Sequence, residues 1–218
     1  MLSNSVRTAN ALSINEIYES IQGEGLLSGT PSVFVRLQGC NLRCPWCDQP
    51  EALSFTKEKT SLEHILQQVE NSAFKHVVIT GGEPMAHPEI GKLVNSLLEE
   101  GYSVQIETNG TLWVNSLEPV ASRIHITCSP KAVAEYFVHP KVRKHAKELK
   151  FIVDEELSSS VLLRKDFVSF LKDGKVVLQP EGNRKDMFHK AIEFQRELSA
   201  FGYTLRVIPQ MHKLFGVP

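Results

Sequence analysis

The segment Ser32–Asp48, SVFVRLQGCNLRCPWCD, joins a short β-strand pattern to three closely spaced cysteines. In its first half, three aliphatic residues occupy alternate positions, which is the period of a strand with one face in a core. Its second half places Cys40, Cys44 and Cys47 in a C-x3-C-x2-C spacing. A glycine and a proline disfavour a regular helix there. We therefore predict a strand that ends in a cysteine-bearing loop.

Similar strand patterns recur along the chain, with helical patterns between them. Besides Ser32–Gln38 we predict strands at His76–Thr80, Ser103–Glu107, Arg123–Thr127, Leu149–Val153, Lys175–Gln179 and Thr204–Ile208. Apolar residues at helical spacing predict helices over Leu62–Val69, Pro88–Leu98, Ser158–Leu171 and Asp186–Phe201. The region 111–147 has no clear helical pattern.

Alternating strands and helices indicate parallel strands joined by right-handed crossovers. A complete eightfold barrel typically needs about 250 residues, and this chain has 218. We therefore predict one α/β domain spanning residues 1–218, either a partial β/α barrel with about six parallel strands or an open doubly wound sheet. In both, functional groups gather where strands end.

The composition argues against several classes of protein. The 24 basic and 25 acidic residues give a net charge of −1, which argues against a nucleic-acid partner. No apolar run approaches the roughly 20 residues of a membrane span, and the first dozen residues do not resemble a secretory signal. We expect a cytoplasmic protein, whose four cysteines are metal ligands or buried thiols rather than disulfides.

Polar residues and glycines directly follow several predicted strands. These segments are Thr80–Pro84, Glu107–Gly110, Ser129–Lys131 and Gln179–Gly182, and the cysteine loop follows the first strand in the same way. Because parallel strands end at one edge of a sheet, this pattern predicts an active site at that edge.

The three cysteines of the loop can converge on one metal centre. Iron–sulfur clusters usually take four cysteines, so three would leave one iron of a four-iron cluster open to a small molecule. A structural zinc site is the alternative, with His125 or Cys128 as a distant fourth ligand. Cys128 itself alternates with Ile126 and is predicted to lie in the core or on the barrel wall.

The Gly81-Gly82-Glu83-Pro84 segment has two interpretations. Its glycines can expose backbone groups to an amino acid ligand, with Glu83 as a charge partner for the ammonium. It can also be an ordinary turn between a strand and a helix.

Taken together, the C-x3-C-x2-C loop and GGEP resemble the radical S-adenosylmethionine (SAM) superfamily. The resemblance implies a [4Fe-4S] cluster whose open iron binds SAM, and a 5′-deoxyadenosyl radical that abstracts a substrate hydrogen. A narrower resemblance, to the 7-carboxy-7-deazaguanine synthase family, covers almost the whole chain. It rests on Glu19–Gly25, Phe34–Cys40, Cys47-Asp48, Ile79–Pro84, Gln105–Gly110, Ser129–Lys131, Leu178–Pro180 and Gln210–Pro218.

The narrower resemblance implies a lyase that converts 6-carboxy-5,6,7,8-tetrahydropterin to 7-carboxy-7-deazaguanine, with loss of ammonia, in queuosine and 7-deazapurine biosynthesis. It also implies a partial barrel, a homodimer and a reductant such as flavodoxin.

By this resemblance, the pterin substrate is bound by Ile21, Gln22, Gly23, Arg36, Thr80 and the chain end Pro218. SAM is bound by Pro45, Trp46, Gly82, Glu107, Ser129, Pro130, Lys131 and Gln179. Arginine is the natural planar partner of a carboxylate. Taken singly, however, Arg36 is typical of a surface salt bridge, and Ile21–Gly25 (IQGEG) is typical of an ordinary N-terminal turn. Candidate bases are Glu24, Glu107 and His212.

The sequence departs from the family at Gln49. The family usually has a threonine or serine there, whose hydroxyl helps bind Mg²⁺. The glutamine amide oxygen can also bind such a cation, but the longer side chain moves it, and its NH₂ group could bond the substrate carboxylate directly. We hypothesise that the protein binds Mg²⁺ differently or works without it.

Two other functions share parts of this pattern. A radical SAM activating enzyme would install a glycyl radical on a partner protein, but would not need the IQGEG segment. A non-catalytic iron–sulfur or zinc module would bind metal without cleaving SAM.

Overall fold

A computed structural model describes residues 10–55 and 58–217, which form a single nine-stranded sheet. The strand order is β3-β1-β2-β4-β5-β6-β7-β8-β9. The strands are β1 (Ala11–Ile21), β2 (Pro31–Leu37), β3 (Lys59–Ser61), β4 (His76–Gly81), β5 (Ser103–Thr108), β6 (His125–Cys128), β7 (Glu148–Val153), β8 (Val176–Pro180) and β9 (Arg206–Val207). All pairings from β2 to β9 are parallel, and those of β1 are antiparallel. The predicted incomplete α/β barrel is confirmed: β3 and β9 lie at opposite ends of the sheet, which does not close.

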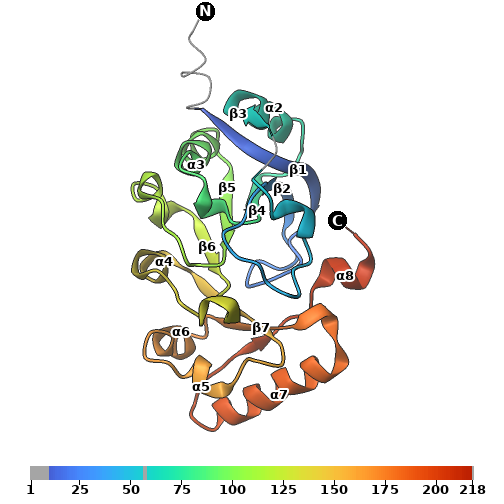
Figure 1. The fold of residues 1–218 in the computed structure, drawn as a ribbon, viewed down its shortest axis with the longest axis vertical. Coiled ribbons are helices and arrows are strands. Elements are labelled where there is room, and N and C mark those ends of the chain that lie inside the picture. The colour runs from blue at the N-terminus through green and yellow to red at the C-terminus, as the bar shows by residue number, and fades with distance from the viewer. Residues whose placement is uncertain (1–9, 56–57, 218) are drawn as a thin grey trace, which may run out of the picture.

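Helices cover the outer side of this sheet. They are α2 (Leu62–Glu70), α3 (Ile90–Glu99), α4 (Pro140–His145), α5 (Ser159–Leu162), α6 (Val168–Lys172) and α7 (Lys185–Ser199), and a further short helix is α8 (Met211–Phe215). Short 3-10 turns are η1 (Pro50–Ala52), η2 (Pro84–Ala86), η3 (Asn115–Leu117), η4 (Ala121–Arg123), η5 (Ala132–Ala134) and η6 (Glu181–Asn183). In Figure 1 the helices α2, α3, α4, α6 and α7 follow one another around one side of the molecule, and α8 lies apart on the other side.

The helix boundaries follow local chemistry. The Ser61 side chain accepts a hydrogen bond from the backbone N–H of His64 and so begins α2. Gly101, with a φ of +83°, follows α3 as expected for a C-terminal stop. The helix predicted over Ser158–Leu171 is two short helices, α5 and α6. Besides strand β6, the region 111–147 holds the six-residue helix α4 and short 3-10 turns, in line with its weak helical pattern.

The two faces of the parallel strands differ in chemistry. Outward-facing residues such as Val35, Ile79 and Ile106 are fully buried with the helices in one hydrophobic core. Inward-facing residues are largely polar, and the strand register aligns Arg36 with Thr80. Because side chains alternate along a strand, the same segments build both the core and a polar interior.

Sequence reasoning missed two of the strands, β3 and the longer β1. The pairing of β1 with β2 shifts register between Ile14 and Glu16, which marks a β-bulge. Before the bulge Leu12 and Ile14 pack on the core, and beyond it Ile17 does. The bulge breaks the strict alternation by which strands are recognised, so the pattern did not reveal the longest strand.

No helix within the described part of the chain is long and apolar enough to cross a membrane.

Candidate functional site

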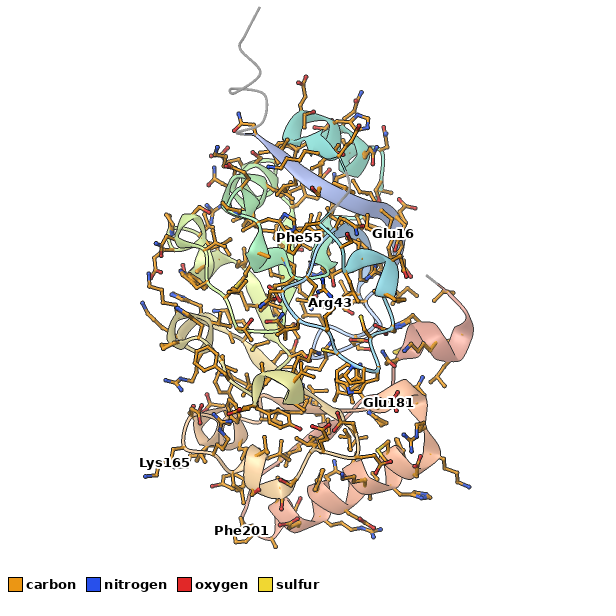
Figure 2. All side chains as sticks on the ribbon, in the orientation of Figure 1. Glu16, Arg43, Phe55, Lys165, Glu181 and Phe201 are labelled. Atoms are coloured by element: carbon orange, nitrogen blue, oxygen red, sulfur yellow. The ribbon has the colours of Figure 1, made fainter. Side chains whose placement is uncertain are left out.

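A cavity of about 510 Å³ opens on the inner side of the sheet. Among the residues predicted for the site, those that line it are Ile21, Gln22, Gly23, Arg36, Cys40, Cys44, Trp46, Cys47, Gln49, Thr80, Gly82, Glu107, Ser129, Lys131 and Gln179. Pro45 and Pro130 do not line it, and Pro218 lies outside the described residues. Figure 2 labels two further lining residues, Glu16 on β1 and Glu181 in η6, on opposite sides of this region.

The cysteine loop is fixed at its start by backbone hydrogen bonds. The N–H groups of Gly39 and Cys40 donate to the carbonyls of Ala52 and Leu53, at 2.7 and 3.1 Å. The side chains of Cys40, Cys44 and Cys47 all line the cavity as free thiols. Burial raises the pKa of Cys40 and Cys44, and each of these two thiols feels the charge of Cys47. All three thiols therefore lie at the cavity wall, near enough to influence one another's charge.

The thiols do not form a site for a single metal ion. Across residues 10–55 and 58–217, no three His, Cys, Asp or Glu side chains are placed to hold one. His125 bonds to Glu148, and Cys128 is fully buried in the core, as predicted. The zinc alternative therefore has no fourth ligand in the part of the chain that the structure describes, whereas an iron–sulfur cluster binds each cysteine to a different iron.

Gly82 lies pressed between two other segments. Its N–H donates to the Leu37 carbonyl at 3.1 Å, and a Cβ built on it would lie 2.2 Å from the Gly39 carbonyl oxygen. Only glycine allows β4 to end so close to the cysteine loop. The position of Gly82 against this loop leaves its backbone at the cavity surface.

Glu83 does not have the role expected from the sequence. Its buried carboxylate accepts hydrogen bonds from the N–H groups of Met85 and Asn109, at 2.8 and 2.7 Å, and from the Thr108 hydroxyl at 2.7 Å. It is absent from the cavity lining, so the expectation of a charge partner for an ammonium is wrong for this conformation. Glu83 instead ties the end of β4 to the end of β5.

Lys131 is the cation beside the cysteines. Its ammonium donates to the Ser129 hydroxyl at 2.8 Å and lies 5.1 Å from the centre of the Trp46 ring. Trp46 in turn donates to Asp154 at 3.0 Å. Burial lowers the pKa of Lys131, and the charge of Lys150 lowers it further. Within the described residues Lys131 has no carboxylate ion-pair partner, which leaves it available to an anionic group in the cavity.

Gln179 offers a second uncommitted group. Its side chain is 1% exposed and lines the cavity, and its Oε1 atom has no hydrogen-bond partner among the described residues. An unpaired buried acceptor is costly, so it indicates a ligand that donates to it.

Lys150 is a site residue that the sequence did not single out. It forms a buried ion pair with Glu24 and lies 3.8 Å from Glu107 Oε2. Burial alone raises the pKa of Glu24, but the Lys150 charge and hydrogen bonds from Lys150 and Gln210 lower it to about 2. Gln22 donates to Glu107 Oε1 at 3.0 Å and so fixes this second carboxylate. The side-chain amide of Gln22 is therefore occupied within the protein.

The C-terminal segment closes one side of the cavity. The Gln210 amide donates to Glu24 at 2.9 Å and to Asp48 at 3.2 Å, and Lys213 forms a 3.0 Å ion pair with Asp48. Burial raises the pKa of Asp48, but its contacts with Lys213 outweigh this and lower it. His212 lies 3.9 Å from Glu24. Gln210 and Lys213 belong to the C-terminal segment that resembles the family, but neither was predicted individually as a site residue.

Arg36 projects into the cavity from β2 between two residues of β1. Its Nε donates to Glu16 at 2.7 Å, and its Nη2 donates to the Tyr18 hydroxyl at 2.6 Å. The Glu16 side chain is 47% exposed and that of Arg36 only 12%, so the ion pair lies at the rim with the guanidinium inside. The surface salt bridge considered from the sequence is real, but it holds a cavity residue.

Comparisons with known proteins agree with this geometry. A profile of the Radical SAM superfamily matches residues 34–151. The 7-carboxy-7-deazaguanine synthase of Aquifex aeolicus is 62% identical over 218 residues, which is 100% of both chains. The enzyme of that name from Halobacterium salinarum is 33% identical over 93% of this chain and 89% of its own. The crystal structure of QueE from Escherichia coli is similar with a TM-score of 0.72 at 29% identity, covering 97% of this chain and 100% of that chain.

Proposed function

We propose, from the premise that this chain belongs to the 7-carboxy-7-deazaguanine synthase family of the radical SAM superfamily, that it converts 6-carboxy-5,6,7,8-tetrahydropterin to 7-carboxy-7-deazaguanine with loss of ammonia. The observation that carries this proposal is one cavity that joins the three free thiols of the cysteine loop to Arg36 and Thr80. A radical generator and a carboxylate-binding site must share a cavity for this reaction.

The residues present fit an iron–sulfur cluster and SAM. Cys40, Cys44 and Cys47 would hold the cluster. The Lys131 ammonium, which bonds to Ser129 but has no carboxylate partner among the described residues, and the unpaired Gln179 oxygen would bind polar groups of SAM. The backbone at Gly82 would lie along its amino acid end. When bound, the cluster supplies the electron that cleaves SAM and so yields the radical that abstracts a substrate hydrogen.

At the other end of the cavity, Arg36 and Thr80 would bind the pterin. They are direct neighbours in the β2–β4 register, so both side chains reach the cavity from adjacent strands. A guanidinium binds a planar carboxylate through two parallel hydrogen bonds. Ile21, the last residue of β1, and Gly23, in the turn that follows it, would complete this end. The main task of these residues is to orient the substrate and exclude water from it.

The structure distinguishes the candidate bases. Glu24 is bound by Lys150 and Gln210, and its pKa of about 2 makes it a weak proton acceptor. Glu107 and His212 both line the cavity and are partly accessible, with side chains 19% and 27% exposed. We favour Glu107 or His212 for the proton loss that follows the radical steps.

The groups near Gln49 do not fit a magnesium ion. Magnesium sites in proteins usually rely on one or two carboxylates. Here the neighbouring carboxylate of Asp48 is already bound by Lys213 and Gln210. We propose that the enzyme works without Mg²⁺ and that the Lys213 ammonium supplies positive charge at this side of the cavity. A homodimeric state and a flavodoxin-like reductant are proposed on the family resemblance alone.

The proposed function is tested by an anaerobic assay. The protein is reconstituted with iron and sulfide and supplied with SAM, a reductant and 6-carboxy-5,6,7,8-tetrahydropterin, and products are separated by chromatography. We expect 7-carboxy-7-deazaguanine and ammonia in equal amounts. Cleavage of SAM to 5′-deoxyadenosine without the deazaguanine would favour an activating enzyme, and the absence of both products would favour a non-catalytic metal module.

A further inference from the structure

The bulge in β1 brings a tyrosine into the cavity. Beyond it, Glu16 pairs with Arg36 and Tyr18 pairs with Phe34, so both β1 side chains face the same interior as Arg36. Tyr18 and Phe34 line the cavity and stack with ring centroids 5.1 Å apart and planes 6° from parallel. Without the bulge, Tyr18 would face the opposite side of the sheet.

The hydrogen bonds of Tyr18 are incomplete. Its oxygen accepts from Arg36 Nη2 at 2.6 Å, and its own proton has no acceptor among the described residues. A phenol both donates and accepts, so its donor capacity is free. Burial is the main cause that raises the pKa of Tyr18 above 10, which keeps the hydroxyl protonated at neutral pH.

Arg36 likewise uses only some of its hydrogen-bond donors within the protein. Of the five N–H donors of a guanidinium, one at Nε bonds to Glu16 and one at Nη2 bonds to Tyr18. The remaining N–H groups have no partner within the described chain. The hydroxyl of Tyr18 and the free N–H groups of Arg36 therefore form adjacent, uncommitted donors in one cavity wall.

We propose that Tyr18 is a further substrate-binding residue whose hydroxyl donates a hydrogen bond directly to the substrate carboxylate, beside Arg36. This inference rests on the proposed function, because it needs a carboxylate at this end of the cavity. Glu16 holds the other edge of the guanidinium, and the stacked Phe34 ring fixes the tyrosine ring. Tyr18 would thus help to distinguish a 6-carboxylated pterin from one without the carboxylate.

The test compares two unreactive ligands on the anaerobically reconstituted holoenzyme. The dissociation constants of 6-carboxypterin and of pterin, which lacks the carboxylate, are measured by calorimetry for wild type and Tyr18→Phe. A hydrogen bond to a charged group is worth enough to weaken 6-carboxypterin about tenfold or more. Binding of pterin should change by less than about twofold. Tyr203→Phe, which removes a hydroxyl outside the cavity, should alter neither constant.

A double variant separates direct contact from positioning. If Tyr18 donates directly, Tyr18→Phe also weakens 6-carboxypterin in an Arg36→Gln background. No further loss there would mean that Tyr18 acts only through Arg36 and would overturn the proposal, as would an equal loss for both ligands or no loss for either. If wild type makes product but Tyr18→Phe binds 6-carboxypterin as tightly as wild type does, this inference alone fails. If wild type neither binds 6-carboxypterin nor makes product, the proposed function fails, and this inference fails with it.

Discussion

Lys150, on β7, and Glu24, in the turn between β1 and β2, form an ion pair buried at the inner wall of the cavity. The same carboxylate accepts a hydrogen bond from Gln210, in the C-terminal segment, and Lys150 also faces Glu107 on β5. The ion pair and its neighbours therefore join four parts of the chain that are far apart in sequence. It fixes the turn that carries the predicted substrate residues to the sheet that carries the predicted SAM residues.

Removing one partner of this pair should destabilise the protein strongly. Lys150→Met leaves Glu24 buried with its main counter-charge gone, for which a loss of about 3–5 kcal/mol in unfolding free energy is typical. Urea unfolding of the anaerobic protein at pH 7 measures it. Lys175→Met breaks the exposed pair with Asp173 and should cost less than about 1 kcal/mol. Equal losses in the two variants would contradict a buried structural pair.

The pair also predicts how stability depends on pH. The pKa of Glu24 falls from an ordinary 4.5 to about 2 in the folded protein. A carboxyl whose folded pKa is lowered contributes stability above its unfolded pKa and loses it as the pH falls through the folded value. We expect this contribution to be complete above about pH 4.5 and to disappear towards pH 2. Glu24→Gln should flatten the unfolding free energy over this window, and an unchanged slope would speak against the assignment.

The cysteines should divide into ligands and a core residue. Cys44→Ser removes one of the three cavity thiols, and we expect it to abolish stable iron and sulfide incorporation and the visible absorbance of the cluster. Cys128→Ala is the matched control, because its thiol is fully buried in the core. This variant should keep its cluster and lose only some stability, about 1 kcal/mol for a small buried side chain. Loss of the cluster in Cys128→Ala would place that thiol among the ligands.

Gly82 should tolerate no side chain. Its Cβ in Gly82→Ala would lie 2.2 Å from the Gly39 carbonyl oxygen and 2.7 Å from that of Ala52, so the cysteine loop must shift. We expect reduced iron incorporation and weaker SAM binding, measured by metal analysis and calorimetry. Gly101→Ala meets nothing within 4 Å and carries only the strain of its positive φ, about 1 kcal/mol. Wild-type iron content in Gly82→Ala would show that the loop can move freely.

Turnover should not depend on magnesium. After exhaustive chelation, we expect product formation at the wild-type rate, because Lys213 already neutralises Asp48. Gln49→Thr combined with Lys213→Met supplies a hydroxyl and removes the ammonium bound to Asp48, so this variant should be active only when Mg²⁺ is added. A strict Mg²⁺ requirement in the unmodified enzyme would disprove the metal-free proposal.

Much of the fold was accessible from local patterns. The alternation of aliphatic residues in Val33–Leu37 and the β-branched run in His76–Thr80 predicted two strands, and the structure buries the aliphatic side chains of both. Cys40, Cys44 and Cys47 line the same cavity because their short spacing places all three in one loop. Such features depend on neighbours within about ten residues, where periodicity and turn chemistry act directly.

The remaining features depend on contacts between distant segments. The β1 bulge shifts the strand period, so neither the strand nor the inward placement of Tyr18 followed from alternation. From the sequence, Glu83 could contact either a ligand or its own turn. In the structure its carboxylate accepts a hydrogen bond from the N–H of Asn109, at the end of the next strand, so it contacts the protein. Lys150 and Gln210 reach Glu24 from elements 126 and 186 residues away. Residue types and spacing thus determined which strands and loops form, whereas the partners of each buried polar side chain were settled only when the sheet brought distant segments together, because those contacts join residues far apart in sequence.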